Sequence, residues 1–184
     1  MQQLTILKIC VMVLVTLAGC QKLRPEQVSI PEYPDLNAFY KDQVKRLGSS
    51  SVEKSVSLDD QKETQLLEMD SVGWAEELSF IREMNPNQPE YVGAFKSNTS
   101  ESRWSLQLKE GESGILKKLV FYPNKKQPSN ISATIHEDKD VYVHHREVSI
   151  SLENDKIISF VLEGYQKMMF KDTVRFSIHA EVRP

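Results

Sequence analysis

The chain has 184 residues, with 23 Lys and Arg against 26 Asp and Glu and a formal net charge of −3 at pH 7. This acidic balance, without a basic stripe of interleaved aromatic residues, argues against nucleic acid as a partner. The length suits one domain with a core large enough to fold alone.

The first nineteen residues have the three parts of a secretory signal peptide. Lys8 supplies one positive charge, Ile9 to Leu17 form an apolar run, and Ala18 and Gly19 are small residues before a cleavage point. A retained membrane anchor is the alternative, but the run is shorter than the roughly 20 apolar residues that span a bilayer. We therefore predict residues 1–19 as a removable signal peptide.

The run ends in Leu17-Ala18-Gly19-Cys20, which resembles the lipobox of bacterial lipoproteins. The resemblance implies that signal peptidase II cuts before Cys20, that its sulfur receives a diacylglycerol, and that its new amine is acylated, with palmitate as a typical chain. The mature protein would be held in a membrane through Cys20, because each buried methylene adds about 0.8 kcal/mol.

Removal of the signal peptide changes the length, the net charge and the cysteine content of the remaining chain. It leaves 184 minus 19, or 165 residues, and removes Lys8, so 22 basic residues face 26 acidic ones for a net charge of −4. Cys10 is removed and Cys20 is acylated. The exported domain then has no thiol for a disulfide, for catalysis or for a metal.

Residues 20–34 are predicted to be the lipidated cysteine followed by a tether. Pro25, Pro31 and Pro34 favour an extended path that could reach about 40 Å. Surface-exposed lipoproteins of Bacteroidota resemble one another in acidic residues after the cysteine, whereas this chain has Lys22 and Arg24 there. This difference favours the periplasmic face of an outer membrane.

A single α+β domain is predicted over residues 35–184. Asp35 is expected to cap a first amphipathic helix that ends at Gly48, and Asp70 or Ser71 a second that ends at Asn85-Pro86. Between these helices, 52–58 and 63–69 are expected to form a β-hairpin.

About seven antiparallel strands are expected to follow as a curved meander. Their predicted ranges are 91–96, 104–108, 116–122, 131–136, 141–152, 157–165 and 174–182. In the last strand one face is apolar and the other polar. In the range 141–152 the apolar residues first lie at odd-numbered positions, Val141 and Val143, and later at even-numbered positions, Val148, Ile150 and Leu152. This change predicts a β-bulge near His145 to Glu147. The order and length are similar to those of small lipoproteins of unknown function in Bacteroidota.

Four histidines are candidate metal ligands: His136, His144, His145 and His179. Adjacent residues on a strand face opposite ways, so His144 and His145 would not share a site. A two-residue turn at Asp138-Lys139 would place His136 and His145 about 13 Å apart on one face, too far for one ion. We expect surface histidines and no metal or other cofactor.

The carboxylates and hydroxyls give no pattern typical of catalysis. Glu76-Glu77 and residues 137–140 lack the spacing of a calcium loop, and turn chemistry and a solvated helix face explain them. No serine lies in a Gly-x-Ser-x-Gly turn. The sequence therefore predicts a protein that is not an enzyme.

Met168, Met169 and Phe170 stand near a predicted turn, where three apolar residues in a row cannot all face one core. The favoured interpretation is that the strand runs on and Met168 or Phe170 folds under a helix. The alternative is a contact tip for a membrane or a partner.

Two short sequences resemble the Asp-Ser/Thr-aliphatic O-glycosylation pattern used by Bacteroidota. They place the candidate acceptors at Ser71 and Thr173. A helix cap at Asp70 and a turn at Asp172 are the competing explanations.

These patterns together predict a membrane-anchored lipoprotein whose domain binds an envelope protein or a lipid, or serves envelope assembly, without catalysing a reaction. The alternative is a carrier of lipid or lipoprotein with an apolar cavity under the sheet, similar in anchoring, size and strand-rich order to the outer-membrane receptor of the lipoprotein-localisation pathway.

Overall fold

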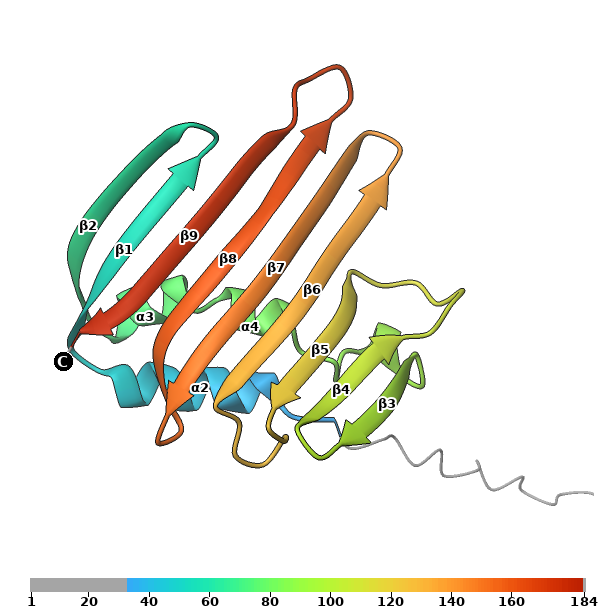
Figure 1. Ribbon diagram of the computed structural model, residues 1–184, viewed down its shortest axis with the longest axis horizontal. Coiled ribbons are helices and arrows are strands. Elements are labelled where there is room, and N and C mark those ends of the chain that lie inside the picture. The colour runs from blue at the N-terminus through green and yellow to red at the C-terminus, as the bar shows by residue number, and fades with distance from the viewer. Residues whose placement is uncertain (1–32, 184) are drawn as a thin grey trace, which may run out of the picture. The chain divides into compact units, whose positions relative to one another are not determined.

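The computed structural model describes residues 33–183, and in them one open antiparallel sheet carries helices on one of its faces (Figure 1). The predicted signal peptide, Cys20 and most of the tether lie outside the described residues. Residues Glu32–Pro184 form a compact unit of their own. The described part therefore has the α+β character that the sequence predicts.

The strands follow the order β2-β1-β9-β8-β7-β6-β5-β4-β3 across the sheet. The strands are β1 (Ser50–Leu58), β2 (Gln61–Met69), β3 (Phe95–Ser100), β4 (Arg103–Leu108), β5 (Leu116–Tyr122), β6 (Asn130–Lys139), β7 (Tyr142–Glu153), β8 (Lys156–Met168) and β9 (Val174–Arg183). The helices are α2 (Leu36–Leu47), α3 (Ser71–Glu77), α4 (Phe80–Glu83) and the 3-10 turn η2 (Pro89–Tyr91).

The seven-strand count is wrong, because the predicted hairpin belongs to the same sheet. Its first strand, β1, pairs with the C-terminal strand β9, so that Val52 lies opposite Val182 and Val56 opposite Ile178. The sheet therefore has nine strands. Such a pairing joins segments far apart in sequence, and no local pattern encodes it.

Helix α2 begins and ends as the sequence predicts. The Asp35 carboxylate accepts hydrogen bonds from the backbone N–H groups of Asn37 (2.9 Å) and Ala38 (3.1 Å). Gly48 ends the helix with φ 55°, a conformation that costs glycine little. The helix buries Leu36 and Leu47 against the sheet.

Gln43 is fully buried on α2 and fixes the helix to the β7–β8 turn. Its Nε2 donates to the carbonyl of Asp155 (2.7 Å), and its Oε1 accepts from the N–H of Ile157 (2.8 Å). Asn154 and Asp155 form this turn with φ of 50° and 60°, as expected for a two-residue hairpin loop. One side chain thus satisfies two backbone groups of another element.

The predicted second helix is divided into α3 and α4. Asp70 caps α3 by accepting from the N–H of Gly73 (2.8 Å), as expected. After Leu78 the hydrogen bonds tighten to three-residue spacing, as in the bond from the N–H of Ile81 to the carbonyl of Leu78 (3.0 Å). The tightening keeps Leu78, Ile81 and Met84 all fully buried.

The strand predicted over 91–96 begins later, at Phe95, because Tyr91 turns into the core. Its ring is 1% exposed, and its hydroxyl accepts a hydrogen bond from the N–H of Leu116 (3.0 Å). Gly114 makes room for the ring, since a Cβ there would overlap it. Burial of Tyr91 therefore outweighs the local strand pattern.

The predicted β-bulge near His145 to Glu147 is wrong, as is the turn at Asp138-Lys139. The β6–β7 pairing is unbroken from Asn130 to Lys139, and the turn lies at Asp140-Val141. The apolar residues shift from odd-numbered to even-numbered positions along β7 because Val141 belongs to this turn and Val143 faces the side of the sheet opposite to the helices. Register shifts occur instead at Leu116/Lys118 and Ser151/Leu152.

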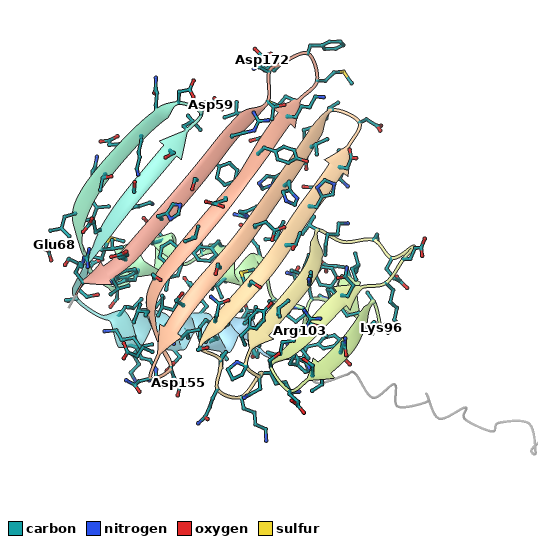
Figure 2. All side chains as sticks on the ribbon, in the orientation of Figure 1. Asp59, Glu68, Lys96, Arg103, Asp155 and Asp172 are labelled. Carbon is teal, nitrogen blue, oxygen red and sulfur yellow. The ribbon has the colours of Figure 1, made fainter. Side chains whose placement is uncertain are left out.

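The helices cover only one end of the sheet (Figure 1). In β8 the buried residues are Ile157, Phe160 and Leu162, and the strand is half-buried or exposed from Glu163 onward. Asp155 lies at the covered end, whereas the turns that carry Asp59 and Asp172 lie at the other (Figure 2). Within residues 33–183, the helices are too short or too polar to cross a membrane.

Candidate functional site

The end of the sheet beyond the helices is the candidate site. It has an inner face, on the side where the helices lie, and a polar outer face. We call Val56, Leu58, Val174, Phe176 and Ile178 the uncovered inner face. Pairing of Val56 with Ile178 and of Leu58 with Phe176 places them side by side on β1 and β9.

Most of these apolar side chains remain open to solvent, whereas Ile178 packs against the edge of the core. Leu58 is 51% exposed, Val174 40% and Val56 36%, while Phe176 and Ile178 are half-buried. A shallow groove beside them is lined by Val56, Leu58 and polar residues of β2. Apolar residues grouped on one face are typical of an interaction surface.

Arg146 marks the border between the covered and uncovered parts of β7. Its guanidinium forms an ion pair with Glu83 of α4, which holds that helix against the sheet. His144 lies two residues before Arg146 on β7, toward the uncovered end of the strand. Burial and the charge of Arg146 lower the pKa of His144 below its usual value of 6.5. The His144 ring lies 6.3 Å from that of Phe176, between their centroids.

Met168, Met169 and Phe170 lie at the turn between β8 and β9, beside the β6–β7 turn. We call these three residues and Val141 the tip. Phe170 is 98% exposed, Met169 50% and Met168 46%. Strand β8 does run on to Met168, but neither Met168 nor Phe170 packs under a helix, contrary to the favoured expectation.

The outer face brings together histidines that the sequence placed apart. His136 pairs directly with His145, and their rings are 5.6 Å apart between centroids, edge to face. The His145 ring also stacks on Tyr165 at 5.4 Å. The expected separation of about 13 Å is therefore wrong, because it rested on the incorrect turn position.

The polar groups of the outer face are bonded mostly to one another. His145 lies 3.4 Å from Glu147, and His179 lies 3.3 Å from Glu163, between imidazole nitrogen and carboxylate oxygen. The part of the chain that the structure describes holds no group of three or more metal-ligating side chains. This arrangement suits a solvated sheet face.

The two acidic segments serve different parts of the fold. Glu77 pairs with Lys54 of β1 at 2.8 Å and fixes α3 to the sheet, while Glu76 is exposed. Glu137 lies on β6 and accepts from the Tyr142 hydroxyl, which raises the pKa of Tyr142. The acidic stretch therefore continues a strand rather than forming a turn.

The two candidate glycosylation residues differ in access. Ser71 is exposed as the first residue of α3, directly after the cap residue Asp70. Thr173 is half-buried in the loop before β9. Modification of either residue remains a prediction, and the site for lipidation, Cys20, lies outside the described residues.

Comparison of the chain with protein-family models, with curated proteins and with solved structures gave no match. The candidate site therefore rests on the geometry of this chain.

Proposed function

We propose that the chain is a lipoprotein anchored through Cys20 on the periplasmic face of an outer membrane, whose domain is a non-enzymatic binding module. Its binding surface is the open end of the sheet. The observation that carries the proposal is the set of apolar side chains left exposed there, beyond the end of the same face that the helices cover.

The uncovered inner face has the chemistry of a surface that binds a partner. Its apolar centre, with Leu58 and Phe176, borders polar groups such as His144, as in interfaces with an apolar core and a polar rim. Partial exposure of several adjacent apolar residues carries a solvation cost that binding would remove.

The test is photo-crosslinking in the native host. A photoreactive residue at Leu58 or Val174 should give an adduct of defined mass, whereas one at Gln107, exposed on the other face of the sheet, should give none. Equal crosslinking from Gln107, or no adduct from Leu58 and Val174, would refute the proposed surface.

Anchoring is tested separately by metabolic labelling with palmitate. The full chain should incorporate the label, and Cys20→Ala should abolish incorporation and release the protein from the membrane fraction. Labelling that persists in the variant would contradict the lipobox assignment while leaving the binding surface open to its own test.

A carrier of lipid or lipoprotein is the second candidate, and the same exposed apolar side chains support it. Under α3 and α4 the space is filled by fully buried side chains, including Trp74, Ile81 and Phe160, and the hollow beside α2 has a partly polar lining that includes Asp42 and Arg46. A carried acyl chain would therefore lie against the uncovered inner face. Native mass spectrometry of the domain from its host distinguishes the two, because a carrier retains a lipid mass.

A further inference from the structure

We propose that the tip inserts into a phospholipid bilayer and gives the protein a second membrane contact. The inference deepens the proposed function, because it names a bilayer as the partner of the tip. It rests on anchoring through Cys20. The tip combines three consecutive apolar residues of one turn with Val141 of the neighbouring turn, itself 59% exposed.

The two turns form one unit rather than two independent loops. The N–H of Met169 donates to the carbonyl of Val141 at 2.9 Å and joins them. The N–H of Lys171 donates to the carbonyl of Met168 at 3.1 Å and closes the β8–β9 turn. Backbone hydrogen bonds between and within the two turns therefore fix the segment that carries Phe170.

The backbone at Phe170 is unfavourable for an aromatic residue. Its φ of 61° lies in the left-handed region, where glycine, asparagine and aspartate are common and a bulky side chain is an outlier. Because the side chain is also almost fully exposed, it contributes little packing to the fold. Strain of this kind is typical of functional positions.

The dimensions of the tip favour a bilayer over a protein partner. One phenylalanine buries about 200 Å², whereas a stable protein interface needs about 800 Å² on each side. A projecting turn with one aromatic and two flexible methionines suits insertion into a fluid acyl layer, which closes around it.

Charged side chains of both signs surround the tip. Lys139 and Lys167 are exposed at the adjacent strand ends and Lys171 in the β8–β9 turn, where their long chains can extend toward phosphates. Four acidic residues at the same end more than offset this charge: Glu137, which pairs with Lys139 at 3.7 Å, and Asp138, Asp140 and Asp172. We therefore expect apolar insertion to dominate, with a weak dependence on salt.

The predicted tether brings the bilayer within reach. Residues 21–34 can extend about 40 Å, and β8, with 13 residues, is about 43 Å long. The two lengths are about equal, so the tip of an anchored protein meets the same membrane when the tether is nearly fully extended.

The test uses residues 32–184, because this segment forms a compact unit with its own buried core. Phe170→Trp serves as a reporter, since the native Trp74 and Trp104 are both buried. With vesicles of phosphatidylethanolamine and phosphatidylglycerol (3:1), we expect its emission to shift to shorter wavelength and to be quenched by brominated lipids.

Sedimentation with the same vesicles measures affinity. Phe170→Ser should lower binding at least tenfold, whereas Leu66→Ser, which removes another exposed leucine on β2, should change it less than twofold. Raising the salt to 1 M should lower binding less than threefold. Unchanged urea midpoints would show that both variants are folded.

Two results of the vesicle assay would overturn the proposal. One is equal vesicle binding by Phe170→Ser and the unsubstituted domain; the other is no vesicle binding by the unsubstituted domain at millimolar lipid. If Phe170→Ser instead removes a protein crosslink, the tip contacts a protein and the bilayer proposal fails. Because the tested segment lacks Cys20, none of these results bears on anchoring, which palmitate labelling decides.

Discussion

Replacement of Gln43 by leucine should destabilise the domain well beyond a typical surface substitution. The leucine keeps the helix-forming character of the position but can form neither side-chain hydrogen bond. The N–H of Ile157, whose side chain is fully buried, would lose its partner, while the carbonyl of Asp155 lies at an exposed turn and could bind water.

The size of the loss in stability follows from the buried position of the Ile157 N–H and the exposed position of the Asp155 carbonyl. A buried unsatisfied N–H costs about 1–3 kcal/mol, and loss of a typical hydrogen bond about 1 kcal/mol. The free energy of unfolding should therefore fall by about 2–4 kcal/mol, and for a domain of this size the melting temperature should drop by about 5–15 °C.

Urea denaturation followed by circular dichroism measures the change. Gln107→Leu is the matched control, because the Gln107 amide also donates to a backbone carbonyl, that of Lys117 at 3.1 Å, but at an exposed position. The control should stay within about 0.5 kcal/mol. A loss below that value for Gln43→Leu would refute the role assigned to this glutamine.

Two further predictions concern the sheet. Gly164→Ala should lower the free energy of unfolding by at least about 2 kcal/mol in urea titrations, because a Cβ would overlap the carbonyl oxygen of His145 on the paired strand. Gly73→Ala is its control and should be near neutral, since there the Cβ would meet the flexible end of Met69 at 3.2 Å; similar losses for both would contradict the steric argument. Because the pKa of His144 is lowered in the fold, the unfolded chain binds more protons below pH 6.5, so stability should fall as pH drops through 6.5 toward the lowered pKa. His144→Asn should flatten this dependence in melts at a series of pH values, and an unchanged slope would show that other groups cause it.

Local patterns predicted those elements in which side-chain alternation and turn chemistry agree. Residues 116–122 form a strand over the predicted range, and β9 alternates as expected, with Ala180 buried and His179 exposed. The Asp35 cap is also as predicted, and the Asn154-Asp155 turn lies in the gap between the predicted strands 141–152 and 157–165. In each case short-range hydrogen bonding and burial favour the same structure.

One error, the position of the β6–β7 turn, arises where a polar sequence continues a strand. Residues 137–139 are charged and suggest a turn, yet Glu137 pairs with His144 and Lys139 with Tyr142 at the end of a solvent-exposed hairpin. Charged residues there keep their contact with water, so β pairing continues with little desolvation cost. The shift of the turn by two residues then moved His136 opposite His145.

The candidate site was only partly accessible from sequence. The tip was visible as Met168, Met169 and Phe170, but the uncovered inner face depends on β1 lying beside β9. Leu58 and Phe176 are 118 positions apart in the chain (176 − 58) and become neighbours only through that pairing. A long-range pairing of this kind has no signature in either strand alone.

The position of β9 has a consequence for how the chain folds. Glu53 and Arg183, 130 residues apart in sequence, form a hydrogen bond of 2.7 Å between β1 and β9. Strand β9 thus enters the sheet between β1 and β8, so the facing edges of these two strands stay unpaired until β9 is added. Assembly must wait for that strand, and contacts of such long sequence separation form slowly.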